Sequence, residues 1–351
     1  MSDGSTSLAV AAALESAESA GWLGPGGAVA VVVSTHGRAG LLGGLLDTLE
    51  RQAGVDFEVV VADNGSPDET WAALVERCAS TPLRLLALRL PFHDGPGVPR
   101  NTCVAAARAS LIAFTDDDCL PTPGWLAALV AAFDDSAGEG VDIVQGATAP
   151  EPGGWAGPWG RSLSVPAASG LFETANLAVR RTSFEAAGGF GAKRLLSGRA
   201  FGEDVVLGAA IAAGGGFRFA PDALVHHRVM PGSYRDFLRE RWRLMGFPLL
   251  VRMVPELRSR AYLGIFLGRR RAITDLGVCG LLLAIGLAAA GRWLGLLALL
   301  AAVPWATVLW REAGARPCVP RPLRAAQLLV ADLVGFAALL IGSARARRLL
   351  L

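Results

Sequence analysis

The hydrophobic pattern of the first 120 residues alternates between two kinds of segment. Short runs of apolar and β-branched residues predict strands buried on both faces of a sheet, and leucines spaced three and four residues apart predict helices between them. The predicted strands are Ala28–Thr35, Phe57–Ala62, Leu83–Leu90 and Ser110–Thr115, and the predicted helices are Leu41–Gln52, Asp68–Cys78 and Pro99–Ala109. This alternation indicates an α/β fold with an open, mostly parallel sheet flanked by helices.

The pattern is less regular on either side of this region. Residues 1–26 are predicted to be a loose leader with a short helix over Leu8–Ala20. After Pro121 a helix at Trp125–Phe133 and a strand at Val141–Gly146 are followed by residues 150–170, whose Gly, Pro, Ser and Trp predict an active-site loop. The main α/β domain is therefore expected to cover residues 27–231.

The last 80 residues contain three long apolar stretches. They are Leu276–Gly291, Trp293–Trp310 and Ala325–Ile341, each near the ~18–20 residues that a membrane-spanning helix needs. We predict an amphipathic connection over residues 232–271 and a membrane region of two to four hydrophobic helices over 272–351. Because Pro304 and Asp332 interrupt these stretches, buried core helices or re-entrant hairpins remain alternatives.

The arginines around the apolar stretches bear on the topology. Arg269-Arg270-Arg271 precedes the first stretch, which places that end in the cytosol under the positive-inside rule. Three full spans would then leave Arg345, Arg347 and Arg348 on the outer side, which the same rule disfavours. The N-terminus lacks the basic segment of a signal peptide, so we expect the first domain on the cytoplasmic face of a cell membrane.

Composition excludes some classes of protein. The net charge is only +2, which does not favour a nucleic-acid partner. The five cysteines are scattered without a CxxC pair, so neither a zinc site nor a disulfide framework is indicated.

Three consecutive carboxylates, Asp116-Asp117-Asp118, follow the fourth predicted strand. Such neighbours repel one another unless a cation balances them, and Mg²⁺ or Mn²⁺ prefers carboxylate and phosphate oxygens. Thr35 and Asp63 fall at the ends of two other predicted strands, where ligands of open α/β sheets bind. The alternative is a solvated acidic turn, since prolines follow at positions 121 and 123.

Six segments from about Val29 to about Gly246, in this order, resemble the inverting family 2 glycosyltransferases, which have the GT-A fold. They are Val31–Arg38, Val59–Asp68, Gly97–Asn101 with Ala105–Ala109, Phe114–Pro121, Phe172–Phe190 and Gly202–Leu207. The first segment differs from the family's usual motif at Ser34, His36 and Gly37. The resemblance implies transfer of a sugar, with inversion, from a nucleoside diphosphate sugar (a UDP-sugar is favoured) to an acceptor hydroxyl.

The resemblance also implies roles for individual residues. Asp118 would coordinate Mg²⁺ or Mn²⁺, with Asp116 beside it, and Asp117 is expected to face away because alternate strand residues point to opposite faces. Asp204 would be the general base, supported by Glu203, although a Glu-Asp pair at a helix start is also an ordinary cap. The donor-binding residues implied are Thr35, Arg38, Asp63, Arg100, Asp116 and Asn176.

Two further candidates lie beyond the donor site. His226 and His227 could add a metal or phosphate contact, or be structural. Arg241 and Trp242 resemble an acceptor-side segment of membrane-linked family members, and the same residues suit an interfacial amphipathic helix.

The hydrophobic C-terminal region suggests a membrane partner and a lipid-linked or envelope-glycan acceptor, although a small-molecule acceptor also stays open. The alternatives for function are a non-catalytic membrane-tethered nucleotide-sugar-binding protein of an envelope assembly and a processive polysaccharide synthase.

Overall fold

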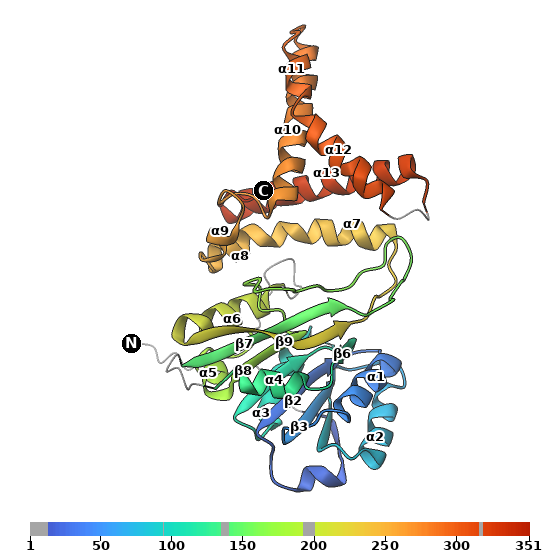
Figure 1. Cartoon of the computed structure of the whole chain (residues 1–351), viewed down its shortest axis with the longest axis vertical. Helices are drawn as coiled ribbons and strands as arrows, with labels where there is room; N and C mark the ends of the chain where they lie inside the picture. Colours follow the sequence, from blue (N-terminus) through green and yellow to red (C-terminus); the bar gives the residue numbers. More distant parts are fainter. Residues whose placement is uncertain (1–12, 94, 135–139, 192–200, 316–318) are drawn as a thin grey trace. The chain divides into compact units, whose positions relative to one another are not determined.

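The computed structural model describes residues 13–93, 95–134, 140–191, 201–315 and 319–351. The chain divides into two compact units (Figure 1). Unit 1 contains Met1–Gly154 and Ser162–Val229, and unit 2 contains Trp155–Arg161 and Met230–Leu351.

Among the described residues, unit 1 is built on one nine-stranded sheet in the order β1-β4-β3-β2-β5-β8-β7-β9-β6. The strands are β1 (Glu15–Glu18), β2 (Val29–Thr35), β3 (Phe57–Asp63), β4 (Leu85–Arg89), β5 (Leu111–Thr115), β6 (Cys119–Pro121), β7 (Val141–Pro150), β8 (Asn176–Arg180) and β9 (Gly216–His227). The α/β class is therefore as predicted.

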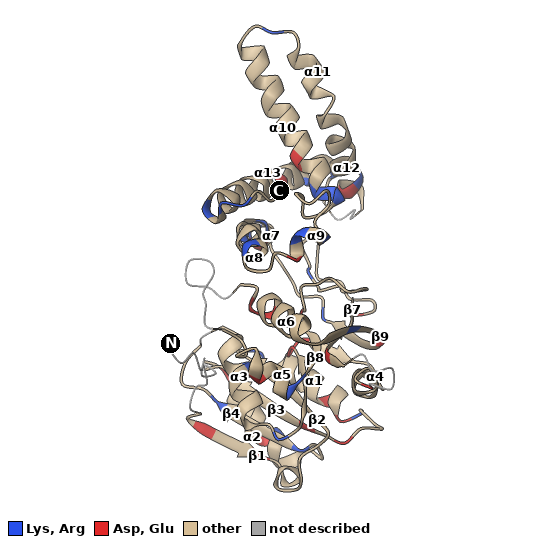
Figure 2. Cartoon of the chain, turned by 90° about the vertical axis from the view of Figure 1, so that its left-hand side faces the viewer, with Lys and Arg blue, Asp and Glu red and all other residues tan. Residues whose placement is uncertain are grey.

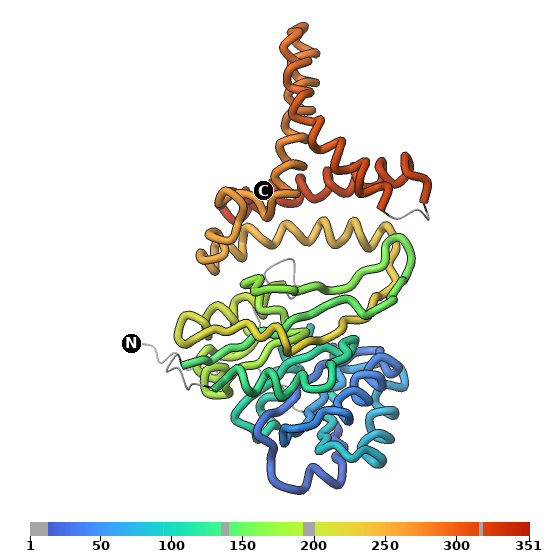
Figure 3. Tube along the Cα trace, viewed as in Figure 1, coloured from blue at the N-terminus to red at the C-terminus, as the bar shows by residue number. Residues whose placement is uncertain are grey.

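The sheet is mixed rather than mostly parallel. Strands β4, β3, β2 and β5 pair in parallel, and β7 runs parallel to β9 along most of its length. Figure 3 traces the path of the chain through these elements from the N-terminus to the C-terminus. Strand β8 pairs antiparallel with both β5 and β7, and β6 pairs antiparallel with β9. These antiparallel pairs join segments far apart in the chain, so local hydrophobic periodicity gives no sign of them.

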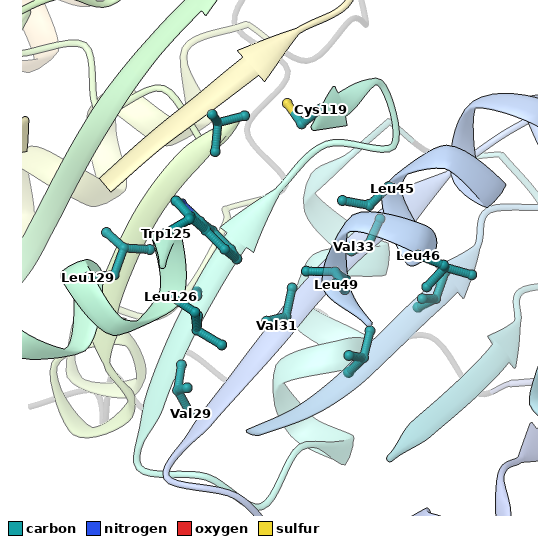
Figure 4. Packing of buried hydrophobic residues seen from close by; sticks show 14 of the residues in the cluster. Val29, Val31, Val33, Leu45, Leu46, Leu49, Cys119, Trp125, Leu126 and Leu129 are labelled. Atoms are coloured by element: carbon teal, nitrogen blue, oxygen red, sulfur yellow. The ribbon is translucent and has the colours of Figure 1, made fainter. Parts of the chain in front are cut away.

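Helices cover both faces of the sheet because each apolar strand sends alternate side chains to opposite faces. Val29, Val31 and Val33 of β2 pack against α1 (Ala39–Leu49), α2 (Thr70–Ser80) and α4 (Trp125–Ala131). Figure 4 shows these valines beside the leucines of α1 and the Trp125 and Leu126 side chains of α4. The opposite face packs against α3 (Gly97–Ala106), α5 (Arg181–Ala186) and α6 (Glu203–Gly214).

The prediction of a loose leader is wrong for its described part. Residues Glu15–Glu18 form the edge strand β1, and a 3₁₀ helix follows at Ala20–Leu23. β1 pairs antiparallel with β4, and Glu15 accepts hydrogen bonds from Arg89 (2.7 Å) and Trp71 (3.1 Å). Edge pairing with a distant strand therefore overrides the weak local preference for a helix, whose first residues, 8–12, lie outside the described residues.

Unit 2 is helical in its described residues. Its helices are α7 (Tyr234–Arg243), α8 (Phe247–Met253), α9 (Leu257–Arg260), α10 (Arg269–Ala289), α11 (Gly295–Leu299), α12 (Ala302–Gly314) and α13 (Arg321–Ala346). Within the described part of the chain, three helical segments are long and apolar enough to cross a membrane: Arg269–Ala289, Gly295–Gly314 and Arg321–Ala346. The predicted connection over 232–271 and the predicted membrane region thus belong to one compact unit.

The predicted active-site loop over residues 150–170 is divided between the units. Trp155–Arg161 packs within unit 2, where Arg161 forms a β-bridge with Met230 and the Trp159 ring lies 4.9 Å from that of Phe237. Val165, in contrast, forms a β-bridge with Thr148 of unit 1.

Candidate functional site

The carboxyl ends of β2, β3 and β5 bring the main candidate residues to one edge of the sheet. β2 and β3 are in parallel register with Thr35 opposite Asp63, and β5 pairs with the other side of β2. The acid triplet follows β5 directly, in a turn that leads into β6. Residues more than fifty positions apart in the chain thus share the edge where open α/β sheets bind ligands.

Arg38 joins two members of the triplet. Its Nη1 donates to Asp117 Oδ1 at 2.9 Å and to Asp118 Oδ2 at 3.0 Å, and the Thr35 hydroxyl donates to Asp117 Oδ2 at 2.7 Å. The expectation that Asp117 faces away is therefore wrong. Residues 116–118 lie beyond the end of β5, in a turn closed by the Cys119 N–H donating to the Asp116 carbonyl, so strand alternation does not apply there.

Arg100 holds the remaining member of the triplet. Arg100 is buried in the first turns of α3, donates to Asp116 Oδ1 at 2.6 Å, and lies over the Phe190 ring. The same guanidinium acts electrostatically on Asp204, the second residue of α6. Arg100 thus links the acid triplet to the predicted general base.

Burial raises the pKa of Asp204 to about 6. The Arg100 charge and a hydrogen bond from the Val205 N–H to Asp204 Oδ1 (3.0 Å) oppose this rise, and the nearby Glu173 carboxylate adds to it. A carboxylate with a pKa just below neutral can take a proton from a hydroxyl more readily than an ordinary aspartate. Asp204 therefore has the protonation behaviour that a general base needs.

Glu203, the predicted support of Asp204, opens α6. Its carboxylate lies against Gly97 at the start of α3, in the space that a Cβ at position 97 would take. A negative charge at the beginning of a helix is favourable because of the helix dipole, so Glu203 stabilises the contact between α3 and α6.

Asp118 also approaches a histidine. Because β6 pairs antiparallel with β9 with Cys119 opposite His227, the His227 Nε2 lies 3.4 Å from Asp118 Oδ1. That buried oxygen has no hydrogen-bond partner among the described residues. Asp118, Cys119 and His227 each place one ligand atom within 4.8 Å of the others.

The chemistry of this group suits a hard divalent cation. The three carboxylates of the triplet face two guanidinium groups, Arg38 and Arg100, which leaves one negative charge unbalanced. Burial raises the pKa of the Cys119 thiol well above its usual value, and that thiol donates to the Ala175 carbonyl at 3.7 Å. The carboxylate oxygens of this group are the donors that Mg²⁺ and Mn²⁺ prefer.

Asp63 offers a second orphaned acceptor at the edge of the sheet. It is fully buried, its Oδ1 accepts from the Ser66 N–H at 3.0 Å, and its Oδ2 has no partner among the described residues. The His36 and His93 rings stack with centroids 4.1 Å apart, and His36 Nδ1 lies 3.0 Å from the Asn64 carbonyl oxygen. Two stacked rings and a buried carboxylate are suited to a flat, hydrogen-bonding group such as a base or a ribose.

Asn176, predicted to bind the donor, is placed in the core instead. It is 1% exposed, and its amide donates to the carbonyls of Ala147 (2.7 Å) and Ala223 (2.8 Å) and accepts from the Trp125 indole (2.8 Å). All three bonds join strands and a helix of unit 1, so the amide is fully engaged in holding the sheet together. The structure gives Asn176 a structural role.

We expect Asn176→Ala to destabilise unit 1. Removing the amide leaves two carbonyls and an indole N–H buried without partners, a cost of about 3 kcal/mol. That loss corresponds to a fall in melting temperature of about 10 °C for a unit of this size. Differential scanning fluorimetry measures this fall. An unchanged melting temperature together with a loss of donor binding would instead support the prediction that Asn176 binds the donor.

Sequence reasoning missed Glu173, a close neighbour of Asp204. Glu173 Oε2 accepts from Ser169 Oγ at 2.7 Å and from Gln145 Nε2 at 2.6 Å. The residue lies inside the resembling segment Phe172–Phe190, but its chemical environment comes from the distant strand β7. The stretch alone carries no sign of that contact.

The predicted acceptor-side residues lie on α7 in unit 2. The Arg241 guanidinium lies 4.6 Å from the centre of the Phe237 ring, and Trp242 is 45% exposed. Their assignment to the acceptor stays a prediction. His226, on the neighbouring position of β9, pairs in register with Leu120 rather than with Cys119.

The chain is similar to proteins named as glycosyltransferases. Glycosyltransferase AglE of Haloferax volcanii is 29% identical over 213 residues, which is 58% of this chain and 66% of that protein. Validoxylamine A glucosyltransferase of Streptomyces hygroscopicus subsp. jinggangensis is 37% identical over 110 residues, which is 30% of this chain and 25% of that protein. The chain thus spans between a quarter and two thirds of the length of these relatives.

A solved structure shares the fold. The mannosyltransferase PcManGT from Pyrobaculum calidifontis, in complex with GDP-Man and Mn²⁺, aligns with a TM-score of 0.56 at 22% identity and covers 92% of this chain and 88% of its own. The expected GT-A-type fold is confirmed by this likeness. The family model that describes "Glycosyl transferase family 2" matches residues 30–195, which include the acid triplet, Asp63, Arg100 and Glu173. Residues 30–195 of this chain are a Glycosyl transferase family 2 domain.

Proposed function

We propose that the protein transfers a sugar from a nucleoside diphosphate sugar, with inversion, to an acceptor hydroxyl. The observation that carries the proposal is that the buried Arg100 bonds to Asp116 of the acid triplet while its charge also acts on Asp204, whose pKa is raised to about 6. The relatives named as glycosyltransferases and the fold neighbour solved with GDP-Man and Mn²⁺ support it. A UDP-sugar remains the favoured donor.

The donor would bind along the edge formed by β2, β3 and β5. Asp63 Oδ2 is free to accept a hydrogen bond from the base or ribose, and the His36 and His93 rings contact the next residue, Asn64. Arg38 and Arg100 supply positive charge where the diphosphate would lie, and Thr35 fixes the Asp117 carboxylate that orients Arg38. The donor would thus be bound at its base or ribose and at its diphosphate, which leaves the anomeric carbon of the sugar accessible to the acceptor.

Asp204 would act as the general base. Inversion requires the acceptor oxygen to attack the anomeric carbon on the side opposite the leaving diphosphate while its proton is removed. Asp204 takes that proton on its carboxylate, and the nucleoside diphosphate leaves with the electron pair of the broken glycosidic bond. Arg100, between Asp116 and Asp204, stabilises the negative charge that grows on the leaving diphosphate and keeps Asp204 ionised at neutral pH.

Asp118 and His227, with Asp116 nearby, would hold the divalent cation. When bound, Mg²⁺ or Mn²⁺ would supply Lewis-acid stabilisation of the diphosphate oxygens. His227 joins this group because its Nε2 already lies beside the unpartnered Asp118 Oδ1.

The three long apolar helices of unit 2 indicate association with a membrane. We place unit 1 on the cytoplasmic face, where nucleotide sugars are available, because Arg269, Arg270 and Arg271 stand at the start of the first of these helices. The same location favours a lipid-linked or envelope-glycan acceptor.

A thermal-shift screen of the detergent-purified protein tests the donor class. With Mn²⁺ present, we expect a UDP-sugar at one hundred times its Kd to stabilise the protein by about 2.7 kcal/mol, seen as a rise in melting temperature. The same donors then enter a single-turnover assay for transfer or donor hydrolysis. Binding without either reaction would show a nucleotide-sugar-binding protein rather than an enzyme. Stabilisation by GDP-sugars alone would overturn the preference for a UDP-sugar donor.

A further inference from the structure

The outward face of α13 is apolar along nearly its whole length. The exposed residues between Leu323 and Ala344 in this fully described helix are Leu323, Ala326, Leu329, Val330, Leu333, Leu340, Ile341 and Ala344. At 100° per residue these positions fall on one stripe, and none of them is charged. Soluble proteins do not present an apolar stripe of about 33 Å to water, since each residue adds about 1.5 Å along the helix.

The opposite face of α13 packs inside unit 2. Tyr234 of α7 donates to the Gln327 carbonyl at 2.8 Å, and Gly342 lies so close to the Met245 backbone that a Cβ would collide with it. The polar residues of this face, Arg324 and Asp332 among them, are buried against neighbouring segments. Figure 1 shows α13 running alongside α7. Helix α7 therefore packs on the face of α13 that lies opposite the apolar stripe of α13.

Helices α10 and α11–α12 form a tight antiparallel hairpin. Gly277 and Gly280 of α10 lie against Trp305 and Ala301, and at both glycines a Cβ would meet these residues within 2.7 Å. The two arms have 21 and 20 residues, or about 30 Å each, which matches the hydrocarbon thickness of a bilayer. Exposed apolar residues cover the far half of the hairpin: Leu282, Leu283, Ile285, Trp293, Leu296, Leu297 and Leu300.

Helix α13 meets this hairpin at its base. Arg270, in the first turn of α10, pairs with Asp332 of α13 (2.9 Å) and with Glu312, near the end of α12 (2.9 Å). The Trp305 indole also donates to Asp332 (2.8 Å), and Arg271 pairs with Asp275. In Figures 1 and 2 α13 crosses the base of the hairpin instead of running along it. Figure 2 shows charged residues gathered at that base, whereas the turn at the tip carries only Arg292.

We propose that α10 and α11–α12 cross the bilayer as a two-span hairpin, and that α13 lies in the membrane interface with its apolar stripe turned toward the acyl chains. Helix α13 is therefore not a third span, although its length and composition would allow one. The bilayer is the occupant of the stripe, because the stripe continues the apolar surface of the hairpin at the level where the hairpin enters the membrane.

Two physical reasons favour this arrangement over three spans. Asp332 is the twelfth of the 26 residues of α13, so a spanning α13 would carry it and the paired arginine to the bilayer centre, where charge is costly. An in-plane α13 keeps the cluster of Arg270, Glu312 and Asp332 at the interface. It also places Arg345, Arg347 and Arg348 on the same side as Arg269, Arg270 and Arg271, as the positive-inside rule requires.

Sidedness of the C-terminus separates the two arrangements. The experiment uses the full chain with two substitutions, Cys279→Ser and Cys318→Ser, and retains the buried Cys78, Cys103 and Cys119. One new cysteine at a time is introduced into this background. Each variant is labelled with an impermeant maleimide in right-side-out and in inverted vesicles. We expect Leu349→Cys to react from the same side as Arg258→Cys, and Arg292→Cys, in the turn before α11, from the opposite side. Reaction of Leu349→Cys from the side of Arg292→Cys would show three spans and overturn the proposal.

Depth measurements on α13 provide the second readout. Nitroxide labels at Leu323, Val330 and Leu340 of the reconstituted protein should give similar depths, about 5–10 Å below the headgroups. A spanning helix would instead show depths that differ by about 15 Å between its middle and its ends, half of the hydrocarbon thickness. Labels that neither oxygen nor a polar nickel complex can reach would mean that protein, such as a second copy of the chain, covers the stripe, which also overturns the proposal.

Discussion

Asp204→Asn should lower kcat for sugar transfer about 10³-fold while changing the KM for the donor by no more than about twofold. Asparagine keeps the size of the side chain but cannot take the proton of the acceptor hydroxyl. We expect the effect on the chemical step, because in the proposed mechanism the donor is held by Asp63, Arg38 and Arg100 on other elements. Steady-state kinetics with the donor identified by thermal shift measure it.

The same substitution should raise the stability of the protein at neutral pH. Burial raises the pKa of Asp204 to about 6, so between pH 4 and 6 the folded state binds more protons than the unfolded state. The free energy of unfolding of the wild type therefore falls as pH rises through this window, by up to about 3 kcal/mol. The asparagine of the variant does not titrate, so the variant should melt higher than the wild type at pH 7.5 and lose this advantage at pH 4.

A pH profile adds an independent check on Asp204. Below pH 6 the wild-type kcat/KM should fall about tenfold per pH unit as the base becomes protonated, and above pH 7 it should be level. Asp222→Asn, an exposed carboxylate of β9, is the matched control and should leave both the rate and this profile unchanged. Full activity in Asp204→Asn would show that another group removes the proton.

Asp118→Asn should lower kcat/KM by about 10³-fold and abolish the Mn²⁺ dependence of donor binding. The substitution removes one carboxylate charge from the triplet while Arg38 keeps its contact with Asp117, so we expect the fold to persist. Circular dichroism and the melting temperature without ligand check that persistence. The thermal shift produced by donor with and without Mn²⁺ measures the loss itself.

The neighbours of Asp118 refine this second prediction. His227→Gln should raise the Mn²⁺ concentration needed for half-maximal activity, because its Nε2 lies beside the unpartnered Asp118 oxygen. Cys119→Ser is the matched control and should leave the metal response unchanged, since the Cys119 thiol is bonded to the Ala175 carbonyl. If Cys119→Ser changed the Mn²⁺ requirement strongly and His227→Gln did not, His227 would not be a metal ligand.

The sequence by itself determined the four parallel strands β2, β3, β4 and β5 and the ends at which they bring residues together. Apolar runs such as Ala28–Thr35 and Phe57–Ala62 are long enough to predict buried parallel strands, because hydrophobic periodicity is a local property of the chain. Parallel strands end at one edge, so the order of the strands and helices along the chain is enough to place Thr35, Asp63 and Asp116 together.

Only the tertiary structure decided how the candidate residues face one another. The antiparallel pairing of β6 with β9 brings His227 to Asp118, and the turn after β5 brings Asp117 to Arg38; neither follows from spacing along the chain. Asn176 lies within a resembling segment, yet its three hydrogen bonds to β7, β9 and α4 place it in the core.

The C-terminal region shows the same division. Composition alone predicted apolar helices and left their number of spans open between two and four. The contacts of α13 with α7 and with the base of the α10–α12 hairpin give that helix a direction, because Asp332 can meet Arg270 and Trp305 only where α13 crosses the hairpin. The local sequence determines the composition of a helix, whereas long-range packing determines the direction of its axis and what its exposed face contacts.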